Sequence, residues 1–312
     1  MKKIMTYVIA PLAFCFLQVN AIQAQWTIKT EQFDVPSAIA QKAATKYGAI
    51  SKTPAAAFAE LAKAAGRELQ LNQTTIYVRA NGDYAAETKA LEGNTKFVYN
   101  NKTKSFSIVQ YDQKKVMTGT RTEIEQTTKQ AASMMSDLEK TMAEAMKNAN
   151  LTEEQKKAAM SYLPGLKKEP EKQAQIEDTG DTMQLIGRRV KRFVMKQPGE
   201  VTTVWAANDD QRLAKVARDI QGNMKSMLKM GRQKKNEIEL LPSGYYPLDT
   251  ITEESGMVGP DVKVNRTIEI VAGNPGAKPF TVPGKKDGFE VTTLQDAMQG
   301  MMQSGSQFRK KR

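Results

Sequence analysis

Residues Thr182–Ala207, TMQLIGRRVKRFVMKQPGEVTTVWAA, decide the fold of this chain. Between positions 190 and 195 the residues Val-Arg-Val alternate with Lys-Phe-Met, which is the two-residue period of a β-strand with two distinct faces. Gly187 breaks the pattern before this strand. The pair Pro198-Gly199 suits the tip of a hairpin, because proline lacks an amide hydrogen and glycine tolerates positive φ. The stretch therefore predicts three consecutive strands, the last ending at Val204-Trp205.

A helix is predicted directly after this sheet segment. Asn208-Asp209 is expected to cap it, and Gly231 stands where a C-terminal cap belongs. Between them, apolar residues recur at spacings of three and four, as on one face of an amphipathic helix. These residues are Leu213, Val216, Ala217, Ile220, Met224, Met227 and Leu228.

The N-terminus has the layout of a secretory signal. Lys2-Lys3 precedes the apolar run Tyr7–Val19, and a small residue, Ala24, marks the expected cleavage position. The run is shorter than the roughly 20 residues of a membrane-spanning helix, although a retained anchor is the alternative. The bulky Phe14 before Cys15 does not fit a lipoprotein signal. We therefore predict a periplasmic or secreted protein.

Two absences limit the chemistry. The chain has no histidine and one cysteine, which is Cys15 inside the predicted signal. This excludes Ser-His-Asp and Cys-His catalysis, disulfides in the mature chain, and zinc sites built on histidine or cysteine. We predict a protein that is not an enzyme and that has no cofactor and no metal site.

The rest of the chain reads as short helices and strands. Helices are expected at Val35–Tyr47 and Thr53–Ala65, a meander of short strands between Leu69 and Thr118, and a methionine-rich helical hairpin at Arg121–Leu163. Further strands are expected at Tyr245–Thr252, Val262–Val271 and Gly288–Val291, with Val262, Val264, Ile268 and Ile270 on one face. We divide the chain into a signal peptide (1–24), an N-terminal helical segment (25–66), a first half of the sheet (67–120), the helical hairpin with a charged linker (121–178), the central hairpin, helix and closing strands (179–292), and a short helix with a basic tail (293–312).

Three passages carry a resemblance to a known family. They are the meander Tyr77–Tyr111, the segment Gly187–Trp205 with its glycine, basic pair, aromatic residue, hairpin and tryptophan, and the F-x-V-P-G sequence Phe280–Gly284. They resemble a bacterial envelope family, a domain of unknown function, related to the periplasmic lipoprotein-carrier (LolA-like) fold. The resemblance implies an α+β fold in which a curved antiparallel sheet, a half barrel, holds amphipathic helices on its concave face and carries a helical-hairpin insertion. It implies no known activity.

The expected function follows from that concavity. We expect the protein to bind a hydrophobic ligand, which is a lipid, an acyl chain or an apolar peptide. The candidate contacts are Phe193, Trp205, Leu213 and Ile220, although residues of each of these types are more often plain core. The first alternative is an envelope-associated interaction protein whose core is filled.

A second alternative is a copper-handling protein, because methionine sulfur is a soft ligand and Met224, Met227 and Met230 stand at helical spacing. Methionine also fills irregular apolar surfaces, and the leucine, isoleucine and alanine in the same stripe favour that interpretation. Basic clusters at Arg188-Arg189, Lys191-Arg192 and Arg309–Arg312, with a net charge of +12, indicate an anionic membrane or envelope surface as a partner, and no nucleic acid. A merely solvated positive face is the alternative.

Overall fold

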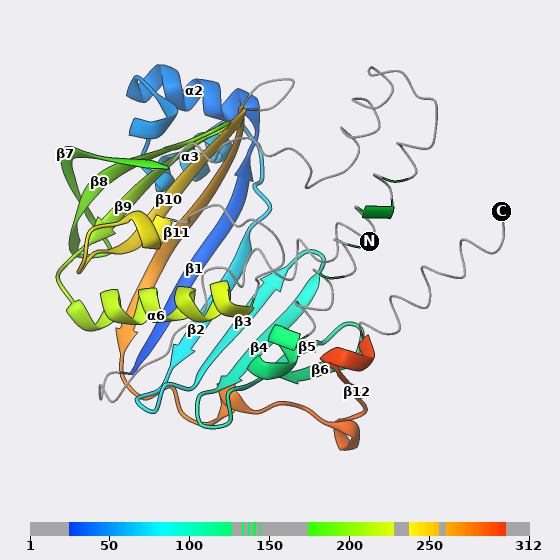
Figure 1. Cartoon of the computed structure of the whole chain (residues 1–312). Coiled ribbons are helices and arrows are strands. Elements are labelled where there is room, and N and C mark those ends of the chain that lie inside the picture. The colour runs from blue at the N-terminus through cyan, green and yellow to red at the C-terminus, as the bar shows by residue number, and fades with distance from the viewer. Residues whose placement is uncertain are drawn as a thin grey trace, which may run out of the picture.

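Figure 1 shows the computed structural model of the chain, an α+β protein built on a single open sheet with few helices. The structure describes residues 25–126, 174–227, 237–255 and 260–297, together with the single helical positions 133, 137, 140, 141 and 144. The predicted signal peptide, most of the predicted helical hairpin 121–178 and the tail beyond residue 297 lie outside these residues.

The sheet has twelve strands in the order β12-β6-β5-β4-β3-β2-β1-β11-β10-β9-β8-β7. β1 therefore joins two runs of chain neighbours, β2–β6 on one side and β11 back to β7 on the other. The strands are β1 Trp26–Val35, β2 Asn72–Val78, β3 Tyr84–Ala90, β4 Gly93–Asn100, β5 Ser105–Gln110, β6 Lys115–Thr120, β7 Gln175–Leu185, β8 Arg188–Gln197, β9 Glu200–Ala207, β10 Tyr246–Ser255, β11 Pro260–Ala272 and β12 Glu290–Thr293.

Most of the predicted strands are confirmed. The stretch 182–207 forms β8, β9 and the end of β7, and its turn glycines, Gly187 and Gly199, adopt φ angles of 76° and 75°. The meander β2–β6 also follows the prediction. The predicted antiparallel sheet is confirmed, with one exception at an edge, where β12 lies parallel to β6. The connection from β11 to β12 runs past the ends of β3–β5, so β12 arrives at β6 in the parallel sense (Figure 1).

The sequence analysis did not identify β1, because residues 25–66 were assigned to a helical segment. In β1 the apolar residues change face partway along the strand. Ile28 packs in one apolar cluster and Phe33, five residues later, packs in another on the opposite face. Neither a helical nor a strand period describes such a pattern over its full length, so the pattern carries no signal for either.

A β-bulge explains a second difference, in β11. Glu269 pairs with Lys29 and Thr267 pairs with Thr30, so Ile268 is an extra residue. The extra residue shifts the alternation of the strand by one. Val262 and Val264 consequently face one cluster and Ile270 the other, while Ile268 is 39% exposed. The prediction that these four residues share a face was wrong.

The helices are α2 (Ser37–Tyr47), α3 (Ala55–Ala64), α6 (Gln211–Met227) and the short α7 (Glu237–Leu240), with 3-10 turns η2 (Ile50–Lys52), η3 (Lys278–Phe280) and η4 (Lys285–Asp287). Residues 121–126 and 294–297 are also helical. In Figure 1, α2 and α3 lie at one end of the strands, and α6 crosses the sheet towards the other end. α2 and α3 pack with Phe33, Ile251 and Val264 of the sheet, so they belong to the main body.

The largest apolar cluster, which we call the aromatic cluster, has buried members on β1–β5, on β8–β10 and on the first turns of α6. Its centre is a series of stacked rings across three strands. Tyr84 lies 4.8 Å from Tyr99 and 5.8 Å from Phe97 between ring centroids, and Phe97 lies 6.1 Å from Phe106. Gly119 on β6 leaves room for the last ring, because a Cβ there would lie 2.7 Å from Cζ of Phe106. A large, closely packed apolar surface therefore forms one face of this half of the sheet.

Candidate functional site

A small apolar cavity lies where α6 meets the sheet. It measures about 50 Å³ and is lined from α6 by Leu213, Val216 and Ala217, and from the strands by residues that include Ile28, Ile76 and Ile270. A site for a drug-sized ligand occupies about 300 Å³ or more, so this space is far smaller than such a site. It is nevertheless a gap in the contact between the helix and the aromatic cluster.

The start of α6 is fixed by polar contacts. Asp210 is the capping residue, since its carboxylate accepts a hydrogen bond of 3.0 Å from the amide of Arg212. The expected cap at Asn208-Asp209 was wrong by one residue because Asp209 is engaged elsewhere. Asp209 accepts a hydrogen bond of 2.5 Å from the hydroxyl of Tyr246 and one of 2.7 Å from Arg188. Burial, and then the bond to Asp209, raise the pKa of Tyr246, so this hydroxyl remains a proton donor.

A second set of contacts ties α6 to the chain between α7 and β10. Arg218 donates hydrogen bonds to the carbonyls of Pro242 (2.5 Å) and Leu241 (3.3 Å) and to the hydroxyl of Ser243 (3.2 Å). Gly244, at φ 88°, lies against the side chain of Gln211, where a Cβ would come within 2.8 Å of Nε2. Directional bonds therefore connect α6 to residues 241–246, whereas Leu213, Val216 and Ala217 meet β1 and β2 through apolar side chains and Arg212 lies over the ring of Trp26 at 5.8 Å.

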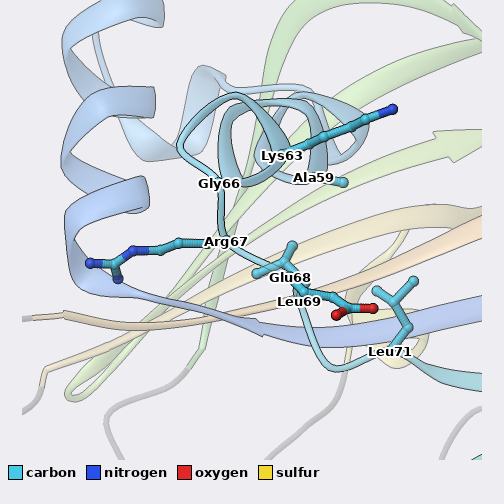
Figure 2. A pocket seen from close by; sticks show the side chains of 7 residues that line it. All are labelled: Ala59, Lys63, Gly66, Arg67, Glu68, Leu69 and Leu71. Carbon is cyan, nitrogen blue, oxygen red and sulfur yellow. The ribbon is translucent and has the colours of Figure 1, made fainter.

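A larger hollow lies at the surface beside α3 (Figure 2). Its volume is about 430 Å³, and it lies between Ala59 and Lys63 of α3 on one side and Leu69 and Leu71 of the following segment on the other. The chain turns here because Gly66 is left-handed (φ 66°) and the amide of Arg67 donates to the carbonyl of Ala62 at 2.9 Å. The charged side chains at its rim are of both signs, which gives the hollow no marked preference for an anion or a cation.

A row of polar side chains crosses the sheet from β8 to β2. Directly paired residues on neighbouring strands point to the same face, and the pairings place six such residues side by side. We call them the polar row: Arg192 on β8, Trp205 on β9, Asp249 on β10, Arg266 on β11, Glu31 on β1 and Gln73 on β2.

Charge alternates along the polar row, and its outer charges are paired. Arg266 donates to Glu31 at 2.8 and 2.5 Å, and Gln73 donates to the same carboxylate at 3.1 Å. At the other end, Arg192 forms an ion pair with Asp181 and lies 5.9 Å from the Trp205 ring. Buried charges are retained in proteins when they are paired in this way.

Asp249, in the middle of the polar row, is 4% exposed. Burial raises its pKa to about 7, although a hydrogen bond from the amide of Thr267 and the charge of Arg266 act in the opposite direction. The indole Nε1 of the neighbouring Trp205 and the hydroxyl of Thr203 are buried without a hydrogen-bond partner within the described part of the chain. Burying polar groups without full hydrogen bonding costs free energy, and these strands therefore carry such a cost.

The structure does not bring the four predicted ligand contacts together. Trp205 pairs with Arg192 and Phe193 pairs with Val204, so Trp205 and Phe193 lie on opposite faces of the sheet. Phe193 instead packs with Met195, Leu241 and the ring of Tyr245. Leu213 does line the cavity beneath α6. The side chain of Ile220 lies outside the described residues.

The other predicted sites have mixed outcomes. The side chains of Met224 and Met227, and all of Met230, fall outside the described residues, as does Arg309–Arg312. Of the central basic cluster, Arg188, Lys191 and Arg192 are ion-paired with Asp209, Asp178 and Asp181. Among the described residues no group of three or more acidic or cysteine side chains is placed to hold a metal ion. Within the same residues, no helix has the length and apolar character needed to cross a membrane.

Sequence reasoning missed the polar row. Its members stand singly on six separate strands, and only the strand order aligns them. A signal was present in β10, where Asp249 interrupts an otherwise apolar and β-branched run from Tyr245 to Ile251. A buried strand that contains one carboxylate is a reason to expect a cross-strand partner.

Comparisons with known proteins do not identify a family for this chain. No protein-family model matches the chain, and no curated protein matches it. Among solved structures, an uncharacterized conserved protein from Thermus thermophilus has a TM-score of 0.38 at 7% identity, covering 93% of this chain and 98% of that chain. Two crystal forms of PNGF-II have TM-scores of 0.32 and 0.25 at 9% and 10% identity. They cover 86% of this chain and 31% of PNGF-II, so this chain spans about a third of that protein.

Proposed function

We propose that this protein is a non-enzymatic binding protein for a hydrophobic ligand, which is a lipid, an acyl chain or an apolar peptide. The ligand is held between α6 and the aromatic cluster, in a LolA-like half barrel whose helices cover the concave face. The observation that supports this proposal is the cavity beneath α6, which is lined with apolar side chains from both the helix and the sheet.

Binding requires the cavity to expand, because 50 Å³ does not hold such a ligand. The attachments of α6 are compatible with expansion. Its directional bonds go to residues 241–246, while Leu213, Val216 and Ala217 meet β1 and β2 through apolar contacts alone. Apolar contacts have no fixed partner geometry, so a ligand of similar polarity can replace them.

The small volume of the cavity favours a second candidate, an envelope-associated interaction protein with a filled core. In this case the aromatic cluster is a permanent interior and binds no ligand. For either candidate we propose a periplasmic or secreted location, reached through cleavage after Ala24. We also propose that the basic tail Arg309–Arg312 attracts anionic membrane or envelope surfaces, since Arg188, Lys191 and Arg192 of the central cluster already have carboxylate partners.

A pair of matched substitutions tests the proposal. Ala217 lines the cavity beneath α6 and Ala59 lines the hollow beside α3, and both are half-buried helical alanines. Ala217→Phe fills the cavity, and Ala59→Phe adds the same ring at the other hollow. We expect the mature protein to bind a fluorescent fatty acid, Ala217→Phe to lower the affinity about tenfold or more, and Ala59→Phe to leave it unchanged.

The outcomes separate the candidates. If Ala59→Phe lowers the affinity instead, the ligand binds beside α3 and the proposed position is wrong. If the unmodified protein binds no fatty acid, and if mass spectrometry of protein purified from its native host finds no bound lipid, the filled-core candidate replaces the proposal. Circular dichroism and urea unfolding of both variants check that each remains folded.

A further inference from the structure

The cavity beneath α6 has one wall built from two adjacent bulges. In β10, Pro247 pairs with Ala206 and Asp249 with Trp205, so Leu248 is an extra residue. In β11 the extra residue is Ile268. The two bulges meet, because Asp249 pairs with Arg266, and residues of both, Leu248 and Thr267, line the cavity.

Asp249 joins the two bulges. Its carboxyl accepts a hydrogen bond of 3.3 Å from the amide of Thr267. The hydroxyl of Thr267 in turn donates to the carbonyl of Leu248 at 2.8 Å. A bulge interrupts the ladder of its strand, so side-chain bonds of this kind replace ladder bonds at the point where the two strands are weakest. One of the two side-chain bonds that link the bulges therefore depends on the state of this carboxyl group.

The surroundings of this carboxyl make ionisation costly. Asp249 is almost completely buried, and its pKa of about 7 lies far above the ordinary value of 3.8 because of that burial. Arg266 is the facing cation, but its guanidinium donates two hydrogen bonds to Glu31. On the other side of Trp205, Arg192 is engaged by Asp181, and near the start of α6 Arg188 is engaged by Asp209. These three arginines are thus already paired with other carboxylates.

We propose that Asp249 is a proton-responsive joint: deprotonation of its carboxyl favours an opened arrangement of the β10 and β11 bulges, in which the carboxylate regains water. Below about pH 7 the closed state keeps the proton on Asp249, whereas in the open state this carboxyl titrates as an ordinary, solvated acid. Opening therefore releases a proton in this range. The opening equilibrium therefore rises by about tenfold for each pH unit between about pH 4 and pH 7, and is level above pH 7. The joint itself requires no ligand; its effect on ligand affinity rests on the proposed function.

Amide exchange at Thr267 measures the opening directly. Protection is calculated from the intrinsic exchange rate at each pH, so that the chemical effect of pH on exchange is removed. We expect protection of the Thr267 amide to fall by roughly tenfold to a hundredfold from pH 5 to pH 7. In Asp249→Asn, whose side chain still accepts a hydrogen bond but does not ionise, we expect protection independent of pH.

Glu253 offers a matched control on the same strand. Burial also raises the pKa of this carboxyl, but it lies away from the bulges. Glu253→Gln should therefore retain the pH dependence of the unmodified protein at Thr267. If Glu253→Gln removes the dependence, or if Asp249→Asn retains it, the joint is not Asp249 and the proposal is wrong.

A measurement on the unmodified protein covers the case in which Asp249→Asn fails to fold. The chain has two tryptophans, Trp26 and Trp205, and Trp205 is the direct neighbour of Asp249. The indole N–H resonance of Trp205 should shift with a midpoint near pH 7. A midpoint near pH 4 would overturn the proposal, whether or not any ligand binds, so its failure is distinguishable from failure of the proposed function.

Discussion

The two halves of the sheet differ in the side chains that they bury. The half formed by β2–β6 buries stacked aromatic rings, whereas the half formed by β8–β11 buries, beside its apolar residues, charged side chains and an indole N–H that meets no acceptor among the described residues. Buried aromatic rings stabilise a fold through the apolar area that they bury and through stacking, whereas buried charges stabilise it only while every partner is present. The difference indicates that the first half supplies most of the stability and that the second half responds to single changes of charge.

The largest expected effect concerns the aromatic half. Phe97→Ala removes a buried ring that stacks on two others, so we expect a loss of about 4 kcal/mol in the free energy of unfolding. Leu91→Ala is the control, because Leu91 is 73% exposed and should cost less than about 0.5 kcal/mol. Urea unfolding at pH 7 measures both. A Phe97→Ala cost near that of the control would show that the aromatic cluster is not the main stabilising core.

The next effect concerns Asp249 and pH. Its pKa is raised in the folded state, so the folded protein keeps a proton that the unfolded chain releases, and stability falls as pH rises from about 4 to about 7. From pH 4.5 to pH 7 this group should remove on the order of 3 kcal/mol from the free energy of unfolding. Asp249→Asn should reduce that slope in urea titrations across this range. An unchanged slope would mean that the carboxyl is not buried as described.

A third effect tests whether the charges of the polar row work as pairs. Glu31→Leu leaves Arg266 without its carboxylate, and we expect a loss of about 2 kcal/mol in the free energy of unfolding. The double substitution Glu31→Leu/Arg266→Met should recover most of that loss, because no charge is then left unpaired. If the double variant is as unstable as the sum of the single variants, the pair contributes through packing and not through charge.

The smallest effect returns to the aromatic half. Gly119→Ala places a Cβ within 2.8 Å of two ring atoms of Phe106 and 3.3 Å from Cβ of Leu294. Overpacking of this kind costs about 1–2 kcal/mol. Thr118→Ala, at the adjacent residue of β6, provides a control for the strand. A neutral Gly119→Ala would indicate that the ring of Phe106 has room to move and that this end of the cluster is loosely packed.

The two halves also differ in how far sequence predicts them. The meander and the hairpin of β8 and β9 follow from alternation and turn residues, which are local signals. β1 was not predicted, because its apolar residues change face between Ile28 and Phe33. The apolar residues of β11 were assigned to the wrong face, because a bulge adds Ile268. Both features depend on the neighbouring strand, which a local pattern does not contain.

The candidate site follows the same division. Leu213 was identified because the apolar stripe of α6 is a helical period. Phe193 and Trp205 were grouped together because the strand order and register that place them on opposite faces are not visible in the sequence. Asp249, Arg266 and Glu31 come from β10, β11 and β1, and their alignment requires the pairing of the chain's first strand with its second-last.

The position of the ligand is tested most directly by methyl NMR of the mature protein during titration with a medium-chain fatty acid such as dodecanoate. The isoleucines that the sheet contributes to the cavity, Ile28, Ile76 and Ile270, are separate from the leucines of the hollow beside α3, Leu69 and Leu71. We predict saturable shifts of the three isoleucine methyl signals and none at the two leucines. Unchanged isoleucine signals at saturating fatty acid would contradict binding beneath α6.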